Sequence, residues 1–432
     1  MKLDYKRTVI IGFAFMSILA FWQFYDQVIP YILKYRFNMD EVTTNTVMTL
    51  DNVLALFMLP LFGVLSDRTR TRLGKRTPYI LFGTIAASGL LFLLAFFEKK
   101  LYFTGFITTL VAILVVMSTY RSPAVAYMPD VTEKPLRSKA NAVINLVGYI
   151  GGIFATVVMM FLPKSTKDEN GTLVFESDPN FMLFFGILAA FMLVSVLVMV
   201  LSVRENRLPH VTDTGETEPA AAKQPLQKGV RLSLLFILLS VFLWFTAYNA
   251  VTTAFSRYCQ EVWDVSLGES SGYLLVATVA AIAAFIPLGF LSSRLGRKKT
   301  VLIGIAVMTC GFLAAAFVTH KTPFMYAIFA IVGIAWAAIN VNSYPMAVEM
   351  GKGADVGKYT GFYYTFSMAA QIVTPVLSGI IIQNTSFGYK ALFPYAVFFS
   401  AASFVTMLFV RHGDYKPAAK DAVLENLAGG DD

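Results

Sequence analysis

The sequence predicts an all-α membrane protein whose twelve transmembrane helices form two pseudo-symmetric bundles of six. Hydrophobic residues make up 56% of the 432 residues and charged residues only 14%, at a mean hydropathy of +0.63. These values exclude an ordinary soluble domain. Twelve apolar runs are long enough to cross a bilayer, and a short basic loop after the second run recurs after the eighth. A loop repeated at half the chain length indicates a duplicated membrane protein.

The twelve apolar runs fall into two sets of six. The predicted spans are residues 8–33, 44–66, 77–97, 102–128, 140–162 and 181–203, then 232–255, 270–293, 300–319, 324–347, 359–383 and 392–411. We therefore expect a six-helix bundle over 1–203, a cytoplasmic linker over 204–231, a second bundle over 232–411 and a cytoplasmic tail over 412–432. The linker is polar and its composition is typical of disorder, so neither it nor the tail is expected to offer a site.

The net charge of +8 reflects topology rather than a nucleic-acid partner. Lys and Arg gather in the termini and in the loops that are cytoplasmic if the N-terminus is cytoplasmic, as the positive-inside rule requires. We therefore expect an integral protein of a bacterial cytoplasmic membrane, monomeric, with both termini in the cytoplasm. Cys259 and Cys310 are too few for a disulfide framework and are expected to be packing residues.

The sequence offers no constellation of a soluble enzyme. His210, His320 and His412 lie far apart in or beside loops, without metal-ligand spacing, and no Gly-rich phosphate-binding loop is present. We therefore expect no catalytic residue, no metal site and no cofactor.

Three of the four tryptophans fall near the midpoints of predicted spans, whereas tryptophan normally gathers at membrane interfaces. Each precedes a polar residue by four positions, which places both side chains on one helical face. The pairs are Trp22 with Asp26, Trp244 with Tyr248, and Trp336 with Asn340. Three such faces indicate a polar cavity with aromatic walls, which suits a carbohydrate. Packing between helices is the alternative for each tryptophan.

Three charged residues fall in the interior of predicted spans, where burial is costly and a charge indicates function. Asp26 and Asp51 lie to the external side of their span midpoints, and Arg121 lies about 9 Å to the cytoplasmic side of its own. These depths argue against a direct Arg121–Asp26 salt bridge. Asp26 and Asp51 could share a site, or one could hold polar backbone at a helix end, and Arg121 could instead extend toward the cytoplasm.

The first basic loop runs from Gly63 to Ile80, and its echo runs from Gly289 to Lys299. Both copies have Gly, three residues, a small polar or acidic residue, Arg, and then Gly with further cations. This pattern resembles the signature loop of the major facilitator superfamily. The longer first copy, with Ser66–Arg72 and Pro78–Ile80, is similar to the glycoside–pentoside–hexuronide cation symporters and most similar to their proton–sucrose branch. The resemblance implies twelve helices in which the first, fourth, seventh and tenth line a central cavity.

The sequence departs from two branches of that family at informative positions. Melibiose-type sodium symporters carry two carboxylates in the second helix and one in the fourth, and the matching residues here are Ala55, Leu59 and Arg121. The resemblance therefore implies a proton rather than sodium as the coupling ion. The sucrose branch carries an arginine where this chain has Val125, which lies one turn after Arg121, and an acid that is kept here as Asp130.

The resemblance also implies that the basic loops gate the cytoplasmic side. Gly63 would let the second helix approach the eleventh, and Asp67 would face the positive N-terminal end of that helix near Lys358–Thr360. The second copy has Ser293 in place of Asp67 and would hold less strongly. The residues expected in gating are Gly63, Asp67, Arg68, Gly74, Arg76, Asp130, Gly289, Arg294 and Gly296.

Together, these patterns predict a secondary transporter that imports a mono- or disaccharide with protons by alternating access. Asp26 is the first choice for proton coupling and Asp51 the second. The residues expected to bind substrate are Trp22, Arg121, Trp244, Tyr248, Asn249, Trp336 and Asn340. A carrier of lipids or amphipathic solutes, and a membrane sensor that transports nothing, are the alternatives.

Overall fold

The computed structural model describes residues 3–132, 137–167, 173–175, 179–207, 228–349 and 356–412. Within these ranges, eleven helices are long and apolar enough to cross a membrane, and a twelfth has a shorter apolar part, Val143–Met159. The predicted all-α architecture with twelve spans is therefore confirmed. Contacts divide the chain into two units, Met1–Thr212 with Asp264–Gly272, and Asp213–Trp263 with Tyr273–Asp432.

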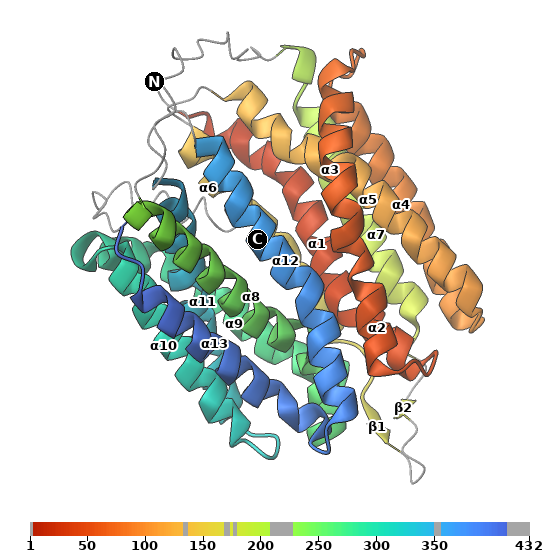
Figure 1. Ribbon diagram of the computed structural model, residues 1–432. Helices are drawn as coiled ribbons and strands as arrows, with labels where there is room; N and C mark the ends of the chain where they lie inside the picture. The colour runs from red at the N-terminus through yellow and green to blue at the C-terminus, as the bar shows by residue number, and fades with distance from the viewer. Residues whose placement is uncertain are drawn as a thin grey trace. The chain divides into compact units, whose positions relative to one another are not determined.

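Unit 1 comprises the helices drawn from red to yellow-green in Figure 1. Its elements are α1 (Tyr5–Tyr35), α2 (Glu41–Met48), α3 (Leu50–Arg68), α4 (Thr77–Lys99), α5 (Phe103–Val131), α6 (Arg137–Met159), α7 (Phe181–Ser202) and η2 (Glu205–Arg207). Helix α1 packs against α5, α6 and α7, while α4 packs against α5 and α7. Helix α3 packs against α5. The first and fourth predicted spans, α1 and α5, are therefore neighbours.

The second predicted span is interrupted at Thr49, where α2 ends and α3 begins. The Thr49 hydroxyl donates to the Thr46 carbonyl at 2.8 Å. Asp40 caps the N-terminus of α2, and its carboxylate accepts from the Thr43 backbone N–H at 3.1 Å. Hydrogen bonds from the side chain and backbone of Thr43 hold the pKa of Asp40 below its usual value.

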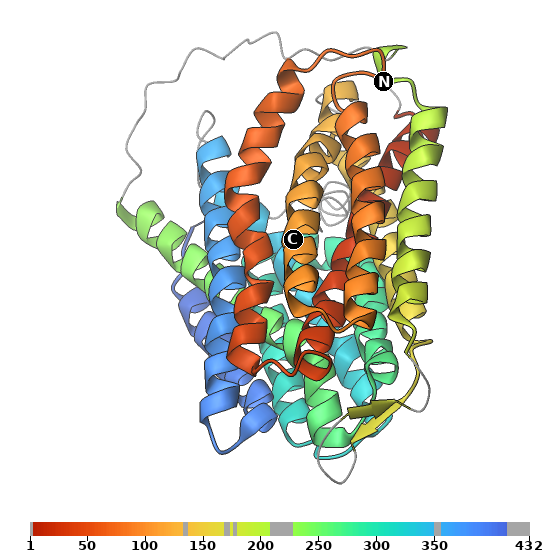
Figure 2. The same ribbon diagram turned by 90° about the vertical axis from the view of Figure 1, so that its right-hand side faces the viewer.

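A small antiparallel hairpin, which the sequence did not predict, joins α6 to α7. Its strands are β1 (Ser165–Lys167) and β2 (Leu173–Phe175), with Ser165 opposite Phe175. The Tyr31 hydroxyl hydrogen-bonds Ser165 at 2.9 Å, which ties the hairpin to α1. Figure 2 shows the hairpin at the opposite end of unit 1 from the α3–α4 loop.

Unit 2 repeats the packing pattern of unit 1. Its elements are α8 (Lys228–Trp263), α9 (Leu267–Leu295), α10 (Arg297–Ala316), α11 (Phe324–Glu349), α12 (Val356–Asn384), η4 (Gly388–Ala391) and α13 (Leu392–Leu408). Helix α8 packs against α12 and α13, as α1 packs against α6 and α7. Helix α10 packs against α11 and α13, as α4 packs against α5 and α7. This correspondence is what a duplicated sequence predicts.

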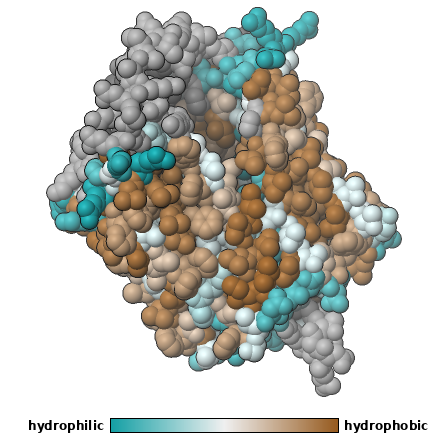
Figure 3. Space-filling model, in the orientation of Figure 1, coloured by the Kyte–Doolittle hydropathy of each residue, from teal (hydrophilic) through white to brown (hydrophobic). Residues whose placement is uncertain are grey.

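Large apolar side chains cover the outer surfaces of the helices. Phe57 on α3 is 69% exposed and Phe82 on α4 is 62% exposed. Figure 3 shows hydrophobic residues across the visible face, with hydrophilic residues gathered toward the ends of the helices. An apolar surface of this extent fits the hydrocarbon of a bilayer.

Helices α1 and α6 approach closely because α6 presents glycines at their contact. A Cβ atom added at Gly148 would lie 2.7 Å from Leu19 Cδ1, and one at Gly151 would overlap the Met16 carbonyl oxygen. These glycines therefore allow the two helices to pack closely.

We predict that Gly151→Leu lowers the unfolding free energy by about 1–3 kcal/mol, because the new side chain must push α1 and α6 apart. Thermal unfolding of the detergent-solubilised protein measures this loss. Gly89→Leu is the matched control, since a Cβ at Gly89 meets nothing within 4 Å. Equal transition temperatures for the two variants would contradict the close approach.

Candidate functional site

The α3–α4 loop is held by one buried cation. Arg76 is 3% exposed, and its guanidinium donates to Asp130 Oδ2 at 2.9 Å and to the Gly63 carbonyl at 3.3 Å. It also donates to Ser66 Oγ and to Asp67 Oδ1. The structure therefore brings together four residues expected in gating, Gly63, Asp67, Arg76 and Asp130.

The first turn of α4 is capped by Glu205, the first residue of η2, which is 1% exposed. One carboxylate oxygen accepts from the backbone N–H groups of Lys75 and Arg76, each at 3.0 Å. The other accepts from the Thr77 N–H at 2.9 Å and from the Thr77 hydroxyl at 2.7 Å. A negative charge placed on the unsatisfied N–H groups of a helix N-terminus stabilises both partners.

Gly74 is required at this cap, since its φ is +117° and a Cβ there would overlap the Glu205 carboxylate. The next residue, Asn206, donates to the carbonyls of Thr71 at 3.0 Å and Arg72 at 2.8 Å. The expectation that the linker over 204–231 is disordered is therefore wrong at Glu205 and Asn206, which belong to an ordered 3-10 helix. Sequence reasoning missed them because no pattern distinguishes Glu205 from the other linker acids.

The second basic loop repeats the backbone geometry of the first. Gly296 has φ +89° and precedes α10, as Gly74 with its positive φ precedes α4. Arg297 is 1% exposed, whereas Arg294 is exposed, as Arg68 is in the first loop. The buried cation of this copy is therefore Arg297.

Two of the gating expectations concern residues that the structure describes only in part. The structure describes the helix backbone at Gly289, Lys358 and Thr360 but not the surroundings of their side chains. Asp67, which was expected to face Lys358–Thr360, pairs with Arg76 within unit 1.

A cluster of aromatic and charged residues lies within the helices of unit 1. The Arg121 guanidinium carbon lies 5.4 Å from the centroid of the Trp22 ring, as in a cation–π contact. Arg121 also lies within electrostatic range of both Asp26 and Asp51. Tyr25 packs edge-on against Trp22 at 5.5 Å. The structure therefore joins Trp22, Asp26, Asp51 and Arg121, from α1, α3 and α5, in one cluster.

The two carboxylates of this cluster have different surroundings. Asn52 Nδ2 donates to Asp51 Oδ1 at 2.9 Å. Among the described residues, no donor hydrogen-bonds the half-buried Asp26 carboxylate, and no ion pair within 4 Å joins it to Arg121. The Trp22 indole N–H is likewise buried without a hydrogen-bond partner in the described structure.

A second aromatic cluster lies within unit 2. Trp336 on α11 is half-buried and stacks on Tyr248 of α8, with ring centroids 3.8 Å apart and planes 18° apart. Trp244 is 1% exposed, stacks on Phe245 at 4.1 Å and meets Trp336 edge-on at 5.2 Å. The Trp336 ring therefore lies nearer the open side of the cluster, and Trp244 packs behind it.

The polar residues near this cluster are linked through α12. Tyr363 donates to Asn340 Oδ1 at 3.3 Å and hydrogen-bonds Ser343 at 3.0 Å. Asn340 is 2% exposed, and Asn249 Nδ2 is buried without a partner among the described residues. Tyr363 and Ser343 were missed because the sequence reasoning followed only the helical faces that carry a tryptophan. No group of three or more His, Cys, Asp or Glu residues in the described ranges is placed to hold a metal ion.

Comparison with known proteins agrees with this architecture. Residues 10–396 match the family model described as MFS/sugar transport protein. An uncharacterized MFS-type transporter of Schizosaccharomyces pombe is 32% identical over 124 residues, which cover 28% of this chain and 27% of that protein. The sodium-dependent lysophosphatidylcholine symporter 1 of Mus musculus is 23% identical over 314 residues, covering 65% of this chain and 58% of that protein.

The chain thus matches about a quarter of the length of the Schizosaccharomyces pombe protein and somewhat over half of the length of the Mus musculus protein. Among solved structures, an auto-inhibited POT family peptide transporter superposes with a TM-score of 0.71 at 14% identity, covering 98% of this chain and 100% of that one. A likeness at this identity shows the major facilitator fold.

We predict that Glu205→Ala lowers the unfolding free energy by about 2–3 kcal/mol, because the first turn of α4 loses a buried charged acceptor. Hydrogen exchange of the amides at 75–77 should accelerate at the same time. Asn206→Ala is the control. It removes only the hydrogen bonds that the Asn206 amide donates to exposed backbone carbonyls, so it should lower the unfolding free energy clearly less. Unchanged exchange at 75–77 in Glu205→Ala would show that the cap does not hold the loop.

Proposed function

Because the chain belongs to the MFS/sugar transport protein family, we propose that it is a secondary active transporter that imports a sugar together with protons. The observation that carries the proposal is the cluster of Trp22, Asp26, Asp51 and Arg121 inside the apolar helices of unit 1. Charges at such depth are costly and are kept for function.

The balance of charge in this cluster supports coupling to a cation. Two carboxylates face one guanidinium, so when all three are charged the cluster carries one net negative charge in a low-dielectric setting. One bound proton cancels that charge. Release of the proton restores it, so the cluster alternates between a neutral and a negative state in each transport cycle.

Asp26 is the better of the two carboxylates for the proton. Asp51 accepts a hydrogen bond from Asn52 and lies in the first turn of α3, where the helix dipole supports a negative charge. Asp26 lies inside α1 without a donor among the described residues. A carboxylate in that position is costly to keep charged, and protonation removes the cost.

The aromatic residues support a sugar as the solute. The half-buried rings of Trp22 and Trp336 can stack on the C–H faces of a sugar. Arg121, held over Trp22, can direct N–H donors at hydroxyl groups. We propose that Tyr248, Asn249 and Asn340 complete the binding residues, with Trp244 supporting the Trp336 ring from behind.

We further propose the expected topology and gating. Both termini are cytoplasmic, the six-helix halves cover 1–203 and 232–411, and the Arg76 network stabilises the cytoplasmic end of the first half. Arg68, Gly289, Arg294 and Gly296 remain proposed members of the gating loops.

A carrier of lipids or amphipathic solutes is the second candidate. It is favoured by the similarity to a lysophosphatidylcholine symporter and by Arg121, which could pair with a phosphate group. Uptake into proteoliposomes separates the candidates. Labelled sugar accumulated under an imposed proton gradient supports the first, and lysolipid uptake without sugar uptake supports the second. Accumulation under a sodium gradient alone would contradict proton coupling, and no transport would favour a sensor.

We predict that Trp336→Ala weakens sugar binding about tenfold, the loss expected for one stacking contact of about 1.4 kcal/mol. Trp336→Phe should retain part of the affinity, since phenylalanine keeps a smaller stacking face. Equilibrium binding of labelled sugar to the purified variants measures both. Equal affinity of the Ala and Phe variants, with normal elution on gel filtration, would assign Trp336 to packing.

We predict that Asp26→Asn keeps sugar exchange at equal concentrations but abolishes accumulation driven by a proton gradient. Asparagine mimics the neutral carboxyl group, so the variant cycles with its solute but carries no proton. Exchange and accumulation are measured in the same proteoliposomes. Asp51→Asn is the control and should damage coupling less. Accumulation by Asp26→Asn would move the coupling role to Asp51.

A further inference from the structure

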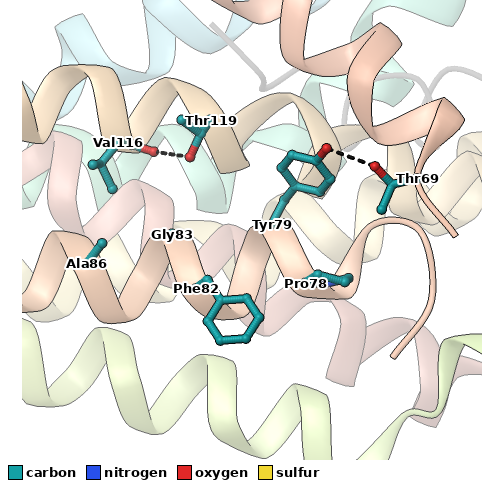
Figure 4. A pocket seen from close by; sticks show the side chains of 8 residues that line it. All are labelled: Thr69, Pro78, Tyr79, Phe82, Gly83, Ala86, Val116 and Thr119. Carbon is teal, nitrogen blue, oxygen red and sulfur yellow. Dashed lines mark hydrogen bonds between the residues drawn. The ribbon is translucent and has the colours of Figure 1, made fainter. Parts of the chain in front are cut away.

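A cavity of about 420 Å³ opens on the outer side of unit 1, where α3, α4 and α5 meet (Figure 4). It is lined by Thr69, Pro78, Tyr79, Phe82, Gly83, Ala86, Val116 and Thr119. We call it the lateral groove. From Pro78 to Ala86 it follows α4 for about 12 Å.

The walls of the lateral groove are mostly apolar. Phe82 is 62% exposed beside it, and Ala86 is exposed as well. Gly83 forms part of the floor and packs directly on Tyr120. A Cβ atom added at Gly83 would lie 2.8 Å from the Cβ atom of Tyr120. A larger side chain at Gly83 could not be accommodated without moving Tyr120. The groove therefore has the form of a slot for a narrow apolar chain, open toward the surface that faces the bilayer.

One end of the groove is polar and lies at the α3–α4 loop. Thr69 Oγ1 hydrogen-bonds the Tyr79 hydroxyl at 2.8 Å across this end (Figure 4). Thr69 is flanked in sequence by Arg68 and Arg70, and both are exposed. In the described part of the chain neither arginine makes an ion pair, and the nearby Asp67 is engaged by Arg76. This end of the groove therefore carries uncompensated positive charge.

We propose that the lateral groove binds an anionic phospholipid of the surrounding bilayer. One acyl chain lies along Phe82 and Ala86, and the phosphate lies at Arg68 and Arg70, where cations next to a span attract anionic headgroups. An apolar slot with a basic rim matches this amphiphile, whereas in a zwitterionic lipid the headgroup ammonium offsets the attraction between the phosphate and the arginines.

The groove is separate from the cluster proposed to bind sugar. Thr119 lines the groove and Arg121 faces Trp22, and residues two apart on a helix point to opposite sides. Because the Thr69–Tyr79 hydrogen bond joins the end of α3 to the start of α4, a bound lipid adds contacts to both arms of the loop that Arg76 holds.

The proposal is tested by native mass spectrometry of delipidated protein titrated with phosphatidylglycerol or phosphatidylcholine of identical acyl chains. Phosphatidylglycerol should bind more tightly than phosphatidylcholine. The double variant Arg68→Ala with Arg70→Ala should bind phosphatidylglycerol about 25-fold more weakly, at about fivefold per cation removed. Ala86→Phe, which fills the slot from an exposed position, should abolish the preferred binding event. The matched controls are Ile85→Phe, exposed on the same helix but outside the groove, and Lys299→Ala in the second basic loop.

Several outcomes would overturn the proposal. They are equal affinity for the two lipids, unchanged binding in Ala86→Phe, or equal losses in the test and control variants. Displacement of the lipid by millimolar inorganic phosphate would reduce the site to an anion site. Displacement by the transported solute would make the groove part of the transport path. Circular dichroism and gel filtration of each variant show that the loss of binding is not loss of fold.

Discussion

The structure depends on one constraint: a charge placed among apolar helices has to be neutralised by its immediate neighbours. Arg76 illustrates this most completely, with Asp67, Asp130 and two neutral oxygen acceptors around its guanidinium. Glu205 meets the same constraint differently, because its partners are backbone N–H groups at the start of α4. Both charges act on the α3–α4 loop, Arg76 through its own side chain and Glu205 through the backbone N–H groups of residues 75–77.

The cluster around Arg121 satisfies the constraint less completely. Its guanidinium lies over Trp22 and within range of two carboxylates, yet no ion pair within 4 Å joins it to Asp26 in the described structure. The Arg76 network is closely bonded, as a structural element should be. The Arg121 cluster retains unused donors and acceptors, including the Trp22 indole N–H. Unused groups of this kind are what a site needs in order to exchange a solute and a cation for water.

The sequence predicted the fold well because hydropathy and the duplicated loops both report on long-range organisation. Spans near 77–97 and 181–203, for example, coincide with α4 and α7. The grouping of Trp22, Asp26 and Asp51 was also within reach, since intramembrane charges are rare. What could not be predicted was the partner of each group. Glu205 lies more than a hundred residues from the helix it caps, and the burial of Trp244 behind Trp336 depends on ring orientations that spacing does not determine.

The interruption at Thr49 divides the second span into α2 and α3. Asp51 lies in the first turn of the second segment, next to backbone N–H groups that have no partner within that turn. Its charge therefore helps to hold the start of α3, and neutralising it would loosen that start. A carboxylate on a continuous helix, such as Asp26 on α1, can change its charge without this consequence. Under the proposed coupling, the divided span thus separates an acid that supports the backbone from the acid that exchanges the proton.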